Sequence, residues 1–466
     1  MSSQNRAFPR KRHYVKTKIT PSAALQKQVQ LGVAGGVFAD HGLRTIHRQK
    51  VPKFESVSGN EVRAFSPLEN PLRQANPMIR TVAVSNYRSL LKLVIPLGEL
   101  NVITGANASG KSNLYRALSL LAGTAQGSVV QALAGEGGLA STFWAGPEKL
   151  SRRMMQGEVP VQGTPRQNAS RLRLGFAGDD FGYSISLGVP RPSLSFFSLD
   201  PEIKRECIWA GPLFRPASLL VDRSGPVIKL RNNRSWDVVA RHTNTFDSLF
   251  GQVSDPVRAP EVVTLRDSIM GWRFYDQFRT DAEAPARLPR LGTRTPVLHH
   301  DGRDLAAALQ TIREIGDAEA LQASIADAFP GGTLSVSREE GGRLAIAFSQ
   351  EGLLRPLGAS ELSDGTLRYL LWVAALMTPR PPPLMVLNEP ETSLHPDLLP
   401  ALARLIIQAS ARTQVWVVSH APRLIASLEK ARNCHSLQLD KHLGQTALKG
   451  QTMLDEPAWR WPDQST

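Results

Sequence analysis

Short apolar runs that stop abruptly at polar residues mark two regions of this chain. Residues 100–104 form one such run, directly before a glycine-rich turn that leads into a helical repeat of leucines. Residues 384–387 and 415–418 form two more, with a helical pattern at about 397–410 between them. Strands that are apolar on both faces and alternate with helices are typical of a parallel sheet covered on both sides. We therefore predict an α/β fold whose sheet takes strands from both regions.

Other segments have different periodicities. Alternating apolar positions predict antiparallel strands over 171–189, and further strands at 79–85, 90–95, 334–336 and 344–348. Helical patterns cover 261–278, 303–328 and 366–377, whereas 123–168 are rich in Gly, Ser and Gln and predict a loop. No heptad repeat is sustained, so we expect no coiled-coil arm.

These patterns divide the chain into five expected segments. Residues 1–77 form a basic N-terminal extension whose composition predicts disorder. The two halves of a nucleotide-binding domain follow at 78–170 and 355–440, separated by an inserted β and helical lobe at 171–354. Residues 441–466 form a C-terminal tail, in which Trp459 and Trp461 are expected to pack back on the parent domain.

The net charge of +14 is unevenly distributed. Residues 1–77 hold 13 Lys and Arg against 4 Asp and Glu, whereas the remaining chain holds 42 against 37. The basic arm around residues 10–18 has the charge to contact nucleic-acid phosphates. The alternatives are a disordered tail, translated sequence upstream of a start at Met78, or a transit peptide, since no acidic residue precedes Asp40.

The two cysteines and the apolar runs limit the setting of the protein. Cys207 and Cys434 are too few for a disulfide scaffold and lie outside any metal-ligand pattern, which favours a reducing compartment such as the cytoplasm. No run of 18 apolar residues is present, so we expect no membrane partner.

The turn after the first apolar run has the spacing G-x-x-x-x-G-K-[ST], which binds phosphate. Glycines let backbone N–H groups approach phosphate oxygens closely, and the following helix adds positive partial charge. Lys111 is expected to reach the β- and γ-phosphates of ATP, and the Ser112 hydroxyl to bind Mg²⁺. The predicted ATP-binding residues are Gly105, Ala106, Asn107, Ala108, Ser109, Gly110, Lys111, Ser112 and Asn113.

Polar residues that end the other two strands predict the hydrolytic chemistry. Glu389 follows the run 384–387 by two positions, where a carboxylate can polarise an attacking water, so we assign it as general base. His420 ends the next strand and is expected to contact the γ-phosphate or the water. Lys111 completes the predicted catalytic set, and Asn388 joins Ser112 at the predicted Mg²⁺ site.

A second anion site precedes the helical pattern at 366–377. Ser363, Asp364 and Gly365 offer a hydroxyl and a turn at a helix N-terminus. One nucleotide rarely needs two such sites from one subunit. We therefore expect this site to bind ATP held by another copy, so that ATP closes a two-fold homodimer.

The order of these motifs resembles the ABC-type ATPase heads of the SMC and RecF group, and more closely the RecF-like ATPases of the AAA_21 class. The resemblance rests on the phosphate loop, 362–366, 386–390 and 418–420, and it extends over roughly residues 78–440. Shorter segments at 272–275, 292–296 and 304–310 are also similar to that group. It implies a P-loop NTPase ABC-type head with an antiparallel β lobe and an inserted helical or mixed lid region.

The resemblance also implies a role for each motif. Residues 105–112 would be Walker A, and 384–388 would be Walker B with Glu389 catalytic. Residues 363–365 would be the signature that contacts the partner's γ-phosphate, and 393–395 would lie in a dimer-contacting loop. His420 would be the switch histidine, and Arg88 would lie near the nucleotide.

Two residues depart from the pattern of that group. Asn388 stands where the Walker B carboxylate is usually Asp, so we expect weaker Mg²⁺ binding and slow turnover. Asp364 stands where many relatives have Gly, which weakens any analogy with transporters. The glutamine that usually links Mg²⁺ to the lobe has no clear counterpart, and Gln126 and Gln131 are candidates by position only.

Two functions compete on this sequence. The first is an ATP-gated dimer that acts on DNA in repair or genome maintenance. The alternative is an ATPase sensor or regulator of an anti-phage defence or toxin system, whose effector is a separate chain. The long insertion at 171–354 disfavours a transporter subunit. A nucleotide switch that binds ATP without hydrolysing it is a further alternative, because Asn388 replaces the usual carboxylate. The cluster of His299, His300 and Asp301 is interpreted as a loop, not a metal site.

One basic stripe lies within the inserted lobe and contains interleaved aromatic residues. It has the composition of a phosphate or DNA contact, and a solvated surface explains it equally well. Its members are Arg266, Arg273, Arg279, Arg287, Arg290 and Arg294.

Overall fold

The computed structural model describes residues 77–147, 151–156, 158, 171–190, 194, 196–197, 199–452 and 454–464. All of them belong to one compact unit, Leu72–Thr466. The predicted basic extension, 1–77, therefore lies outside the described residues except for its last position. Within the described ranges, no helix combines the length and the apolar character that crossing a membrane requires.

A six-stranded sheet unites the two halves of the nucleotide-binding region. Its order is β10-β15-β16-β3-β17-β18, and all neighbours are parallel except β17 and β18. The strands are β10 (Arg273–Tyr275), β15 (Leu384–Asn388), β16 (Gln414–Val418), β3 (Leu100–Gly105), β17 (Cys434–His442) and β18 (Gln445–Leu448). The predicted parallel sheet with strands from both regions is confirmed.

The apolar strands of this sheet supply two hydrophobic cores, one on each face. Val386 and Val418 belong to one core, and Leu387 and Val417 belong to the other. Successive side chains of a strand point to opposite faces, so a strand covered on both sides needs apolar residues at every position. This is why residues 384–387 and 415–418 show no alternation.

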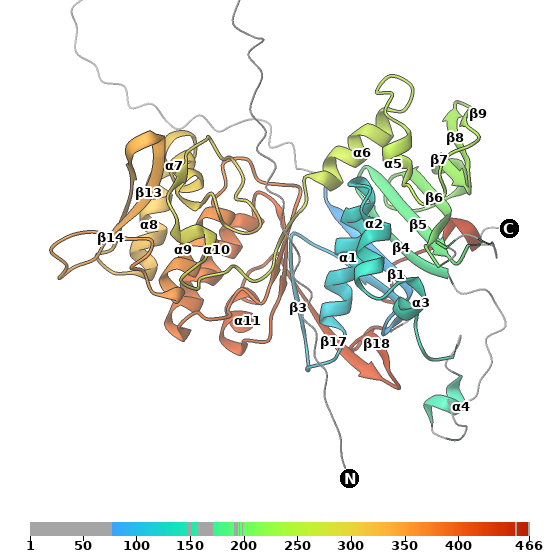
Figure 1. Cartoon of the computed structure of the whole chain (residues 1–466). Helices are drawn as coiled ribbons and strands as arrows, with labels where there is room; N and C mark the ends of the chain where they lie inside the picture. The colour runs from blue at the N-terminus through green and yellow to red at the C-terminus, as the bar shows by residue number, and fades with distance from the viewer. Residues whose placement is uncertain are drawn as a thin grey trace, which may run out of the picture. The chain divides into compact units, whose positions relative to one another are not determined.

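Helices cover both faces of the sheet. Figure 1 shows α1 and α2 on one side of β3 and the group α7 to α11 on the other. The first group comprises α1 (Lys111–Ala125), α2 (Val129–Gly135), α3 (Leu139–Thr142), α5 (Leu249–Gln252) and α6 (Pro260–Met270), whereas α4 (Arg152–Met155) lies apart from them in Figure 1. The second comprises α7 (Leu305–Ile315), α8 (Ala318–Ala328), α9 (Asp364–Leu376), α10 (Leu399–Ser410) and α11 (Pro422–Leu428).

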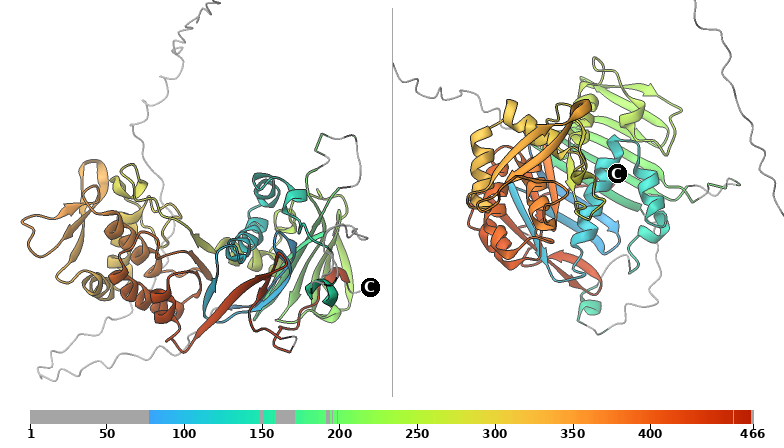
Figure 2. Two further views of the ribbon diagram at one scale, coloured as in Figure 1. Left: turned by 90° about the horizontal axis from the view of Figure 1, so that it is seen from below. Right: turned by 60° about the vertical axis from the view of Figure 1, so that its left-hand side comes forward.

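Two antiparallel sheets complete the fold, as Figure 2 shows. The larger has the order β2-β1-β4-β5-β6-β7-β8-β9. Its strands are β1 (Ile79–Tyr87), β2 (Leu90–Pro96), β4 (Arg171–Gly178), β5 (Phe181–Gly188), β6 (Glu202–Ala210), β7 (Leu219–Ser224), β8 (Val227–Asn232) and β9 (Ser235–Ala240). The smaller joins β11 (Arg290–Leu291), β12 (Thr333–Arg338), β13 (Arg343–Ser349) and β14 (Leu357–Gly358). The predicted α/β class with an antiparallel lobe is thereby confirmed.

Some local predictions were wrong. The helix expected over 261–278 ends at Met270, and the short strand β10 follows it. The loop expected over 123–168 contains α2 and α3. In the C-terminal segment, Trp461 is buried and the Asp463 carboxylate accepts from Arg173 Nε at 2.8 Å, so this end of the chain packs on β4.

Candidate functional site

The predicted site residues lie along one edge of the parallel sheet. The strand register places Asn388 beside Val418, and Val418 beside Ile103, which is two residues before the phosphate loop. Tyr275 of β10 pairs with Leu387, so Asp276 and Asn388 follow at the same level. At roughly 4.8 Å between strands, the start of the loop and the end of β15 are about 10 Å apart. The sheet thus brings the two halves of the predicted site to a common edge.

The phosphate loop has the backbone that its glycines permit. Gly105 and Gly110 have φ of 147° and 110°, and Ala108 is left-handed at 64°. A Cβ at Gly105 would come within 2.6 Å of Ser109 Oγ, so no larger residue fits there. Gly110 ends the loop and α1 begins at Lys111, so the free N–H groups of the first helical turn adjoin the loop. The loop therefore has the glycine turn and the adjoining helix N-terminus that an anion cradle requires.

Lys111 lies folded over this cradle. Its Nζ donates to the carbonyl oxygens of Gly105 at 2.6 Å and Ala106 at 3.1 Å. The hydroxyl of Ser109 is buried and has no hydrogen-bond partner among the residues that the structure describes, whereas buried polar groups normally have one. Ser112 is exposed on the first turn of α1. The lysine charge and the orphaned hydroxyl both suit a phosphate ligand.

Hydrogen bonds from two other elements brace the loop. Thr446 Oγ1 donates to the carbonyl of Ser109 at 2.8 Å and lies 2.7 Å from Ser89 Oγ. Asn113 Nδ2 donates to the same Ser89 hydroxyl at 2.8 Å. Asn113 therefore holds the loop to the β1–β2 turn, and Thr446 holds it to β18.

Sequence reasoning missed a carboxylate next to Asn388. Asn388 Nδ2 donates to Asp276 Oδ1 at 2.7 Å. Asp276 is exposed directly after β10, and burial, with a smaller contribution from the Asp276 charge, raises the pKa of Tyr115 on α1. The acid therefore stands between the end of β15 and the helix that begins at Lys111. The only sequence signal for Asp276 is its position after the aromatic segment 272–275, which the helical periodicity assigns to a helix.

Glu389 and His420 come together beyond the ends of β15 and β16. His420 Nδ1 lies 3.5 Å from Glu389 Oε1, and both side chains are about half exposed. Glu389 has a left-handed backbone with φ of 49°, and its N–H donates to the carbonyl of Val418 at 2.8 Å. This strained conformation, held by the neighbouring strand, turns the carboxylate toward the histidine.

A second acid, Glu391, holds the segment that carries the histidine. Its Oε1 accepts from Ser419 Oγ at 2.7 Å, from His420 N–H at 3.0 Å and from Ala421 N–H at 3.2 Å. Glu391 is buried, unlike Glu389. Sequence reasoning missed this positioning residue, because nothing in the run 388–391 tells which acid points inward.

The predicted signature caps helix α9. Ser363 Oγ accepts from Thr366 N–H at 3.2 Å, and Asp364 Oδ1 accepts from Arg287 Nη2 at 2.7 Å. Arg287 also donates to the carbonyl of Leu362 at 2.8 Å, so one buried guanidinium fixes the turn. In the part of the chain that the structure describes, no hydrogen bond or ion pair joins 363–365 to the phosphate loop.

Other predicted candidates have structural partners. Arg88 forms an ion pair with Glu136 at 2.7 Å. His299 contacts Asp301 through Nδ1 at 2.7 Å and Arg303 through Nε2 at 2.6 Å, so both of its ring nitrogens have protein partners in this loop. Gln126 caps the far end of α1 from Lys111, and Gln131 lies in α2, so neither is at the phosphate end.

Comparison with known proteins gives one family and several solved structures. The AAA_21 family, described as "AAA domain, putative AbiEii toxin, Type IV TA system", matches residues 100–426. No curated protein matches the sequence. The Smc head bound to the C-winged-helix domain of ScpA is 14% identical, with a TM-score of 0.41 over 81% of this chain and 99% of that one.

Two further SMC head structures are similar to this chain. The SMC head domain from Thermotoga maritima is 14% identical, with a TM-score of 0.40 over 81% of this chain and 100% of that one. The Smc head with an extended coiled coil, bound to the C-terminal domain of ScpA derived from Pyrococcus furiosus, is 13% identical, with a TM-score of 0.41 over 80% and 96% of the two chains.

Proposed function

Because this chain belongs to the AAA_21 family, we propose that it binds ATP with Mg²⁺ and hydrolyses the γ-phosphate. The observation that carries the proposal is the shared sheet edge. The cradle that ends at Lys111, the carboxylate of Glu389 and the imidazole of His420 follow the carboxyl ends of β3, β15 and β16. Ligands of open parallel sheets bind at this edge.

The residues present fit ATP and Mg²⁺. Ser109 offers an unpartnered buried hydroxyl, and Gly105 leaves room that a Cβ would fill. On the opposite side, Ser112, Asn388 and Asp276 offer the oxygen ligands that Mg²⁺ prefers, directly or through its waters. When bound, Mg²⁺ would neutralise charge on the β- and γ-phosphate oxygens. Asp276 supplies in this arrangement the negative charge that Asn388 lacks.

The hydrolytic step uses residues of the neighbouring strand ends. Lys111 would exchange its two loop carbonyls for phosphate oxygens, and the loop N–H groups would hold the β-phosphate. Glu389 would accept a hydrogen bond from the attacking water and orient it toward the γ-phosphate. His420, 3.5 Å from that carboxylate, would hold the water or a γ-phosphate oxygen from the other side.

A second copy of the chain would complete the site. Among the described residues, Ser363, Asp364 and Gly365 have no bond to their own phosphate loop, and at the start of their helix α9 only the N–H of Thr366 is capped, by Ser363 Oγ. We therefore propose that they contact ATP held by the partner, so that ATP closes a homodimer and hydrolysis opens it.

Glu389→Gln tests the whole proposal, because it keeps the shape of the side chain and removes the base. With ATP and Mg²⁺ the variant should accumulate as a dimer in light scattering, and phosphate release should fall by about 10²-fold or more. Lys111→Ala should stay monomeric, since it loses the phosphate contact. Equal phosphate release by wild type and Glu389→Gln, or no dimer with ATP, would refute the assignment.

We propose DNA as the object of this ATP-gated dimer, in repair or genome maintenance, on the resemblance to RecF and SMC heads. The alternative is an ATPase sensor or regulator in a toxin or anti-phage system with a separate effector chain, which the family description favours. Binding of duplex DNA by Glu389→Gln only when ATP is present would support the first. Growth arrest or phage protection in cells that depends on Glu389 would support the second.

A further inference from the structure

The arginines of the basic stripe do not form one shared surface. Arg266 and Arg279 pair with neighbouring aspartates, and Arg294 lies 3.7 Å from Glu314. Arg273 donates to three carbonyl oxygens of its own turn. These four are satisfied within the lobe. The last two members, Arg287 and Arg290, both line one hollow, and the Arg287 guanidinium is itself bonded to the carbonyls of Ala359 and Leu362.

This hollow opens beside the edge of strand β13. On that edge β11 pairs with residues 343–344 and β14 pairs with 347–348. Ala345 and Ile346 between them have a strand partner on the β12 side only. The gap in the ladder opens into a cavity of about 720 Å³, within the roughly 300–1,000 Å³ of small-molecule sites.

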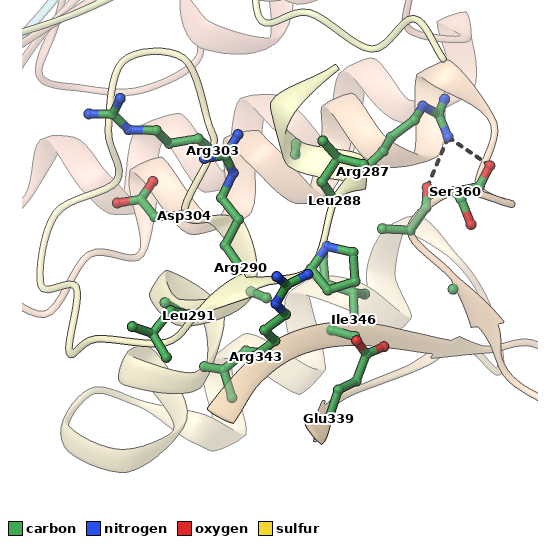
Figure 3. A pocket seen from close by; sticks show the side chains of 18 of the residues that line it. Arg287, Leu288, Arg290, Leu291, Arg303, Asp304, Glu339, Arg343, Ile346 and Ser360 are labelled. Atoms are coloured by element: carbon green, nitrogen blue, oxygen red, sulfur yellow. Dashed lines mark hydrogen bonds between the residues drawn. The ribbon is translucent and has the colours of Figure 1, made fainter. Parts of the chain in front are cut away.

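Four arginines surround the hollow, against two acids. Figure 3 shows Arg290 and Arg343 extending from β11 and β13 toward the same space, with Arg303 in the turn before α7 directing its guanidinium away from Arg343. Of the acids, Asp304 accepts from the N–H of His299 at 3.0 Å, and Glu339 is exposed. We name the site formed by Arg287, Arg290, Arg303 and Arg343 the arginine hollow.

The guanidiniums of Arg290 and Arg343 are available to bind a ligand. Among the described residues, neither Arg290 nor Arg343 has a side-chain hydrogen bond or ion pair, and both are exposed. Arg303 has contacts to His299 and Asp301. Unpaired guanidiniums around one cavity repel each other and present the fork of donors that matches phosphate.

The walls of the hollow are apolar. Leu288 and Leu291 are 54% and 69% exposed, and Ile346 lies on the floor with the strand gap. A purely inorganic anion would leave these surfaces unused. A ligand that carries both a phosphate and a flat base would cover them and place its charge on the arginines.

We infer that the arginine hollow binds a nucleoside 5′-phosphate, either as a free mononucleotide or as the end of a nucleic-acid strand. Its wall is continuous with the signature. Arg287 lines the hollow and donates to the carbonyls of Ala359 at 2.9 Å and Leu362 at 2.8 Å, and to Asp364. A ligand there would stiffen the turn that presents Ser363. This coupling rests on the proposed function, whereas the binding itself does not.

Calorimetry with two probes tests the binding. The probes are AMP and a single-stranded octathymidylate with a 5′-phosphate. The same oligonucleotide without the 5′-phosphate is the control. At least one phosphate-bearing probe should bind wild type and Lys111→Ala with equal affinity, since the site is not the phosphate loop. Arg290→Ala with Arg343→Ala should weaken binding by about ten- to hundredfold per arginine. Arg258→Ala with Arg313→Ala removes the same charge from exposed positions outside the hollow and should change nothing.

The probes also separate the two sources. Binding of AMP identifies a free mononucleotide, and binding of the oligonucleotide that requires its 5′-phosphate identifies a strand end. No binding of either probe, or equal loss in both arginine pairs, would overturn the inference. The link between the arginine hollow and the signature turn is measured by hydrogen exchange in the Lys111→Ala variant, so that the result does not depend on ATP binding. Amide hydrogens of 358–366 should then exchange several-fold more slowly with the probe bound, and unchanged exchange would refute the link to the signature.

Discussion

Asp276→Asn isolates the charge that we place at the Mg²⁺ site. The amide that it creates has almost the shape of the carboxylate and can still contact Asn388, which lies 2.7 Å away. An ion held through Asn388 would lie about 4 Å from the carboxylate, since Mg²⁺ binds oxygen at roughly 2.1 Å. The substitution therefore changes electrostatics and leaves packing intact.

The size of the effect follows from that separation. Two unit charges at about 4 Å interact by roughly 1 kcal/mol in water and about 4 kcal/mol near a protein surface, and the divalent ion doubles either figure. Asp276 is exposed, so the lower value applies. About 2 kcal/mol corresponds to roughly a 30-fold weaker affinity for Mg²⁺.

A fluorescent ATP analogue titrated with Mg²⁺ measures this affinity without turnover. Asp276→Asn should shift the Mg²⁺ midpoint upward by that factor, while binding without metal should hold. The double variant with Asn388→Asp returns a carboxylate to β15 and should recover most of the loss. Asp180→Asn, an exposed acid in the β4–β5 turn, is the matched control. An unchanged Mg²⁺ midpoint in Asp276→Asn, as in Asp180→Asn, would refute the assignment of Asp276 to the Mg²⁺ site. A double variant that recovers none of the Mg²⁺ affinity would refute it as well.

Two substitutions and one cysteine-labelling reaction test the structure around the site. Glu391→Ala removes the acceptor shared by three donors of 419–421, of which, among the described residues, only Ala421 N–H keeps another acceptor, Ser419 Oγ. The free energy of unfolding in urea should fall by about 3 kcal/mol, and phosphate release should fall more than ATP binding; an unchanged rate would contradict the positioning role of Glu391. Arg223→Met leaves Glu206 buried without its cation and should cost about 3–5 kcal/mol in urea unfolding, whereas the exposed Arg234→Met should cost almost nothing. Burial raises the pKa of Cys434 to about 11, so iodoacetamide at pH 8 should label it roughly a hundredfold more slowly than a free thiol, and rapid labelling would contradict its burial.

The sequence predicts strands β3, β15 and β16 of the parallel sheet, but it misses β10 at one edge and β17 and β18 on the far side of β3. Residues 384–387 and 415–418 are apolar at every position because both faces are covered, and that pattern is local. β10 has only three residues and directly follows α6, so its aromatic side chains continue a helical pattern. The strand is defined by its pairing with β15, which lies more than a hundred residues later.

The same reason hides Asp276 while the phosphate loop is visible. The loop is one continuous segment whose glycines and lysine carry its chemistry by themselves. Asp276 acquires a role only when β10 lies beside β15 and brings it to Asn388. Arg287 is similar, because among six arginines of one stripe only its contacts to 359–364 distinguish it.

One more buried arginine connects the two halves of the proposed site. Arg368, on the signature helix α9, donates to the carbonyl of Thr392 at 3.0 Å and to that of Phe278 at 2.7 Å. Those carbonyls lie just beyond Glu389 and Asp276, the acids at the ends of β15 and β10. Burial lowers the pKa of Arg368, but an arginine stays charged at any physiological pH. A guanidinium is planar, so its two bonds have a fixed separation, and a displacement of either segment must move α9 or break a buried charged hydrogen bond. If ATP is hydrolysed at the sheet edge as proposed, Arg368 would therefore link that reaction to the orientation of Ser363 on α9.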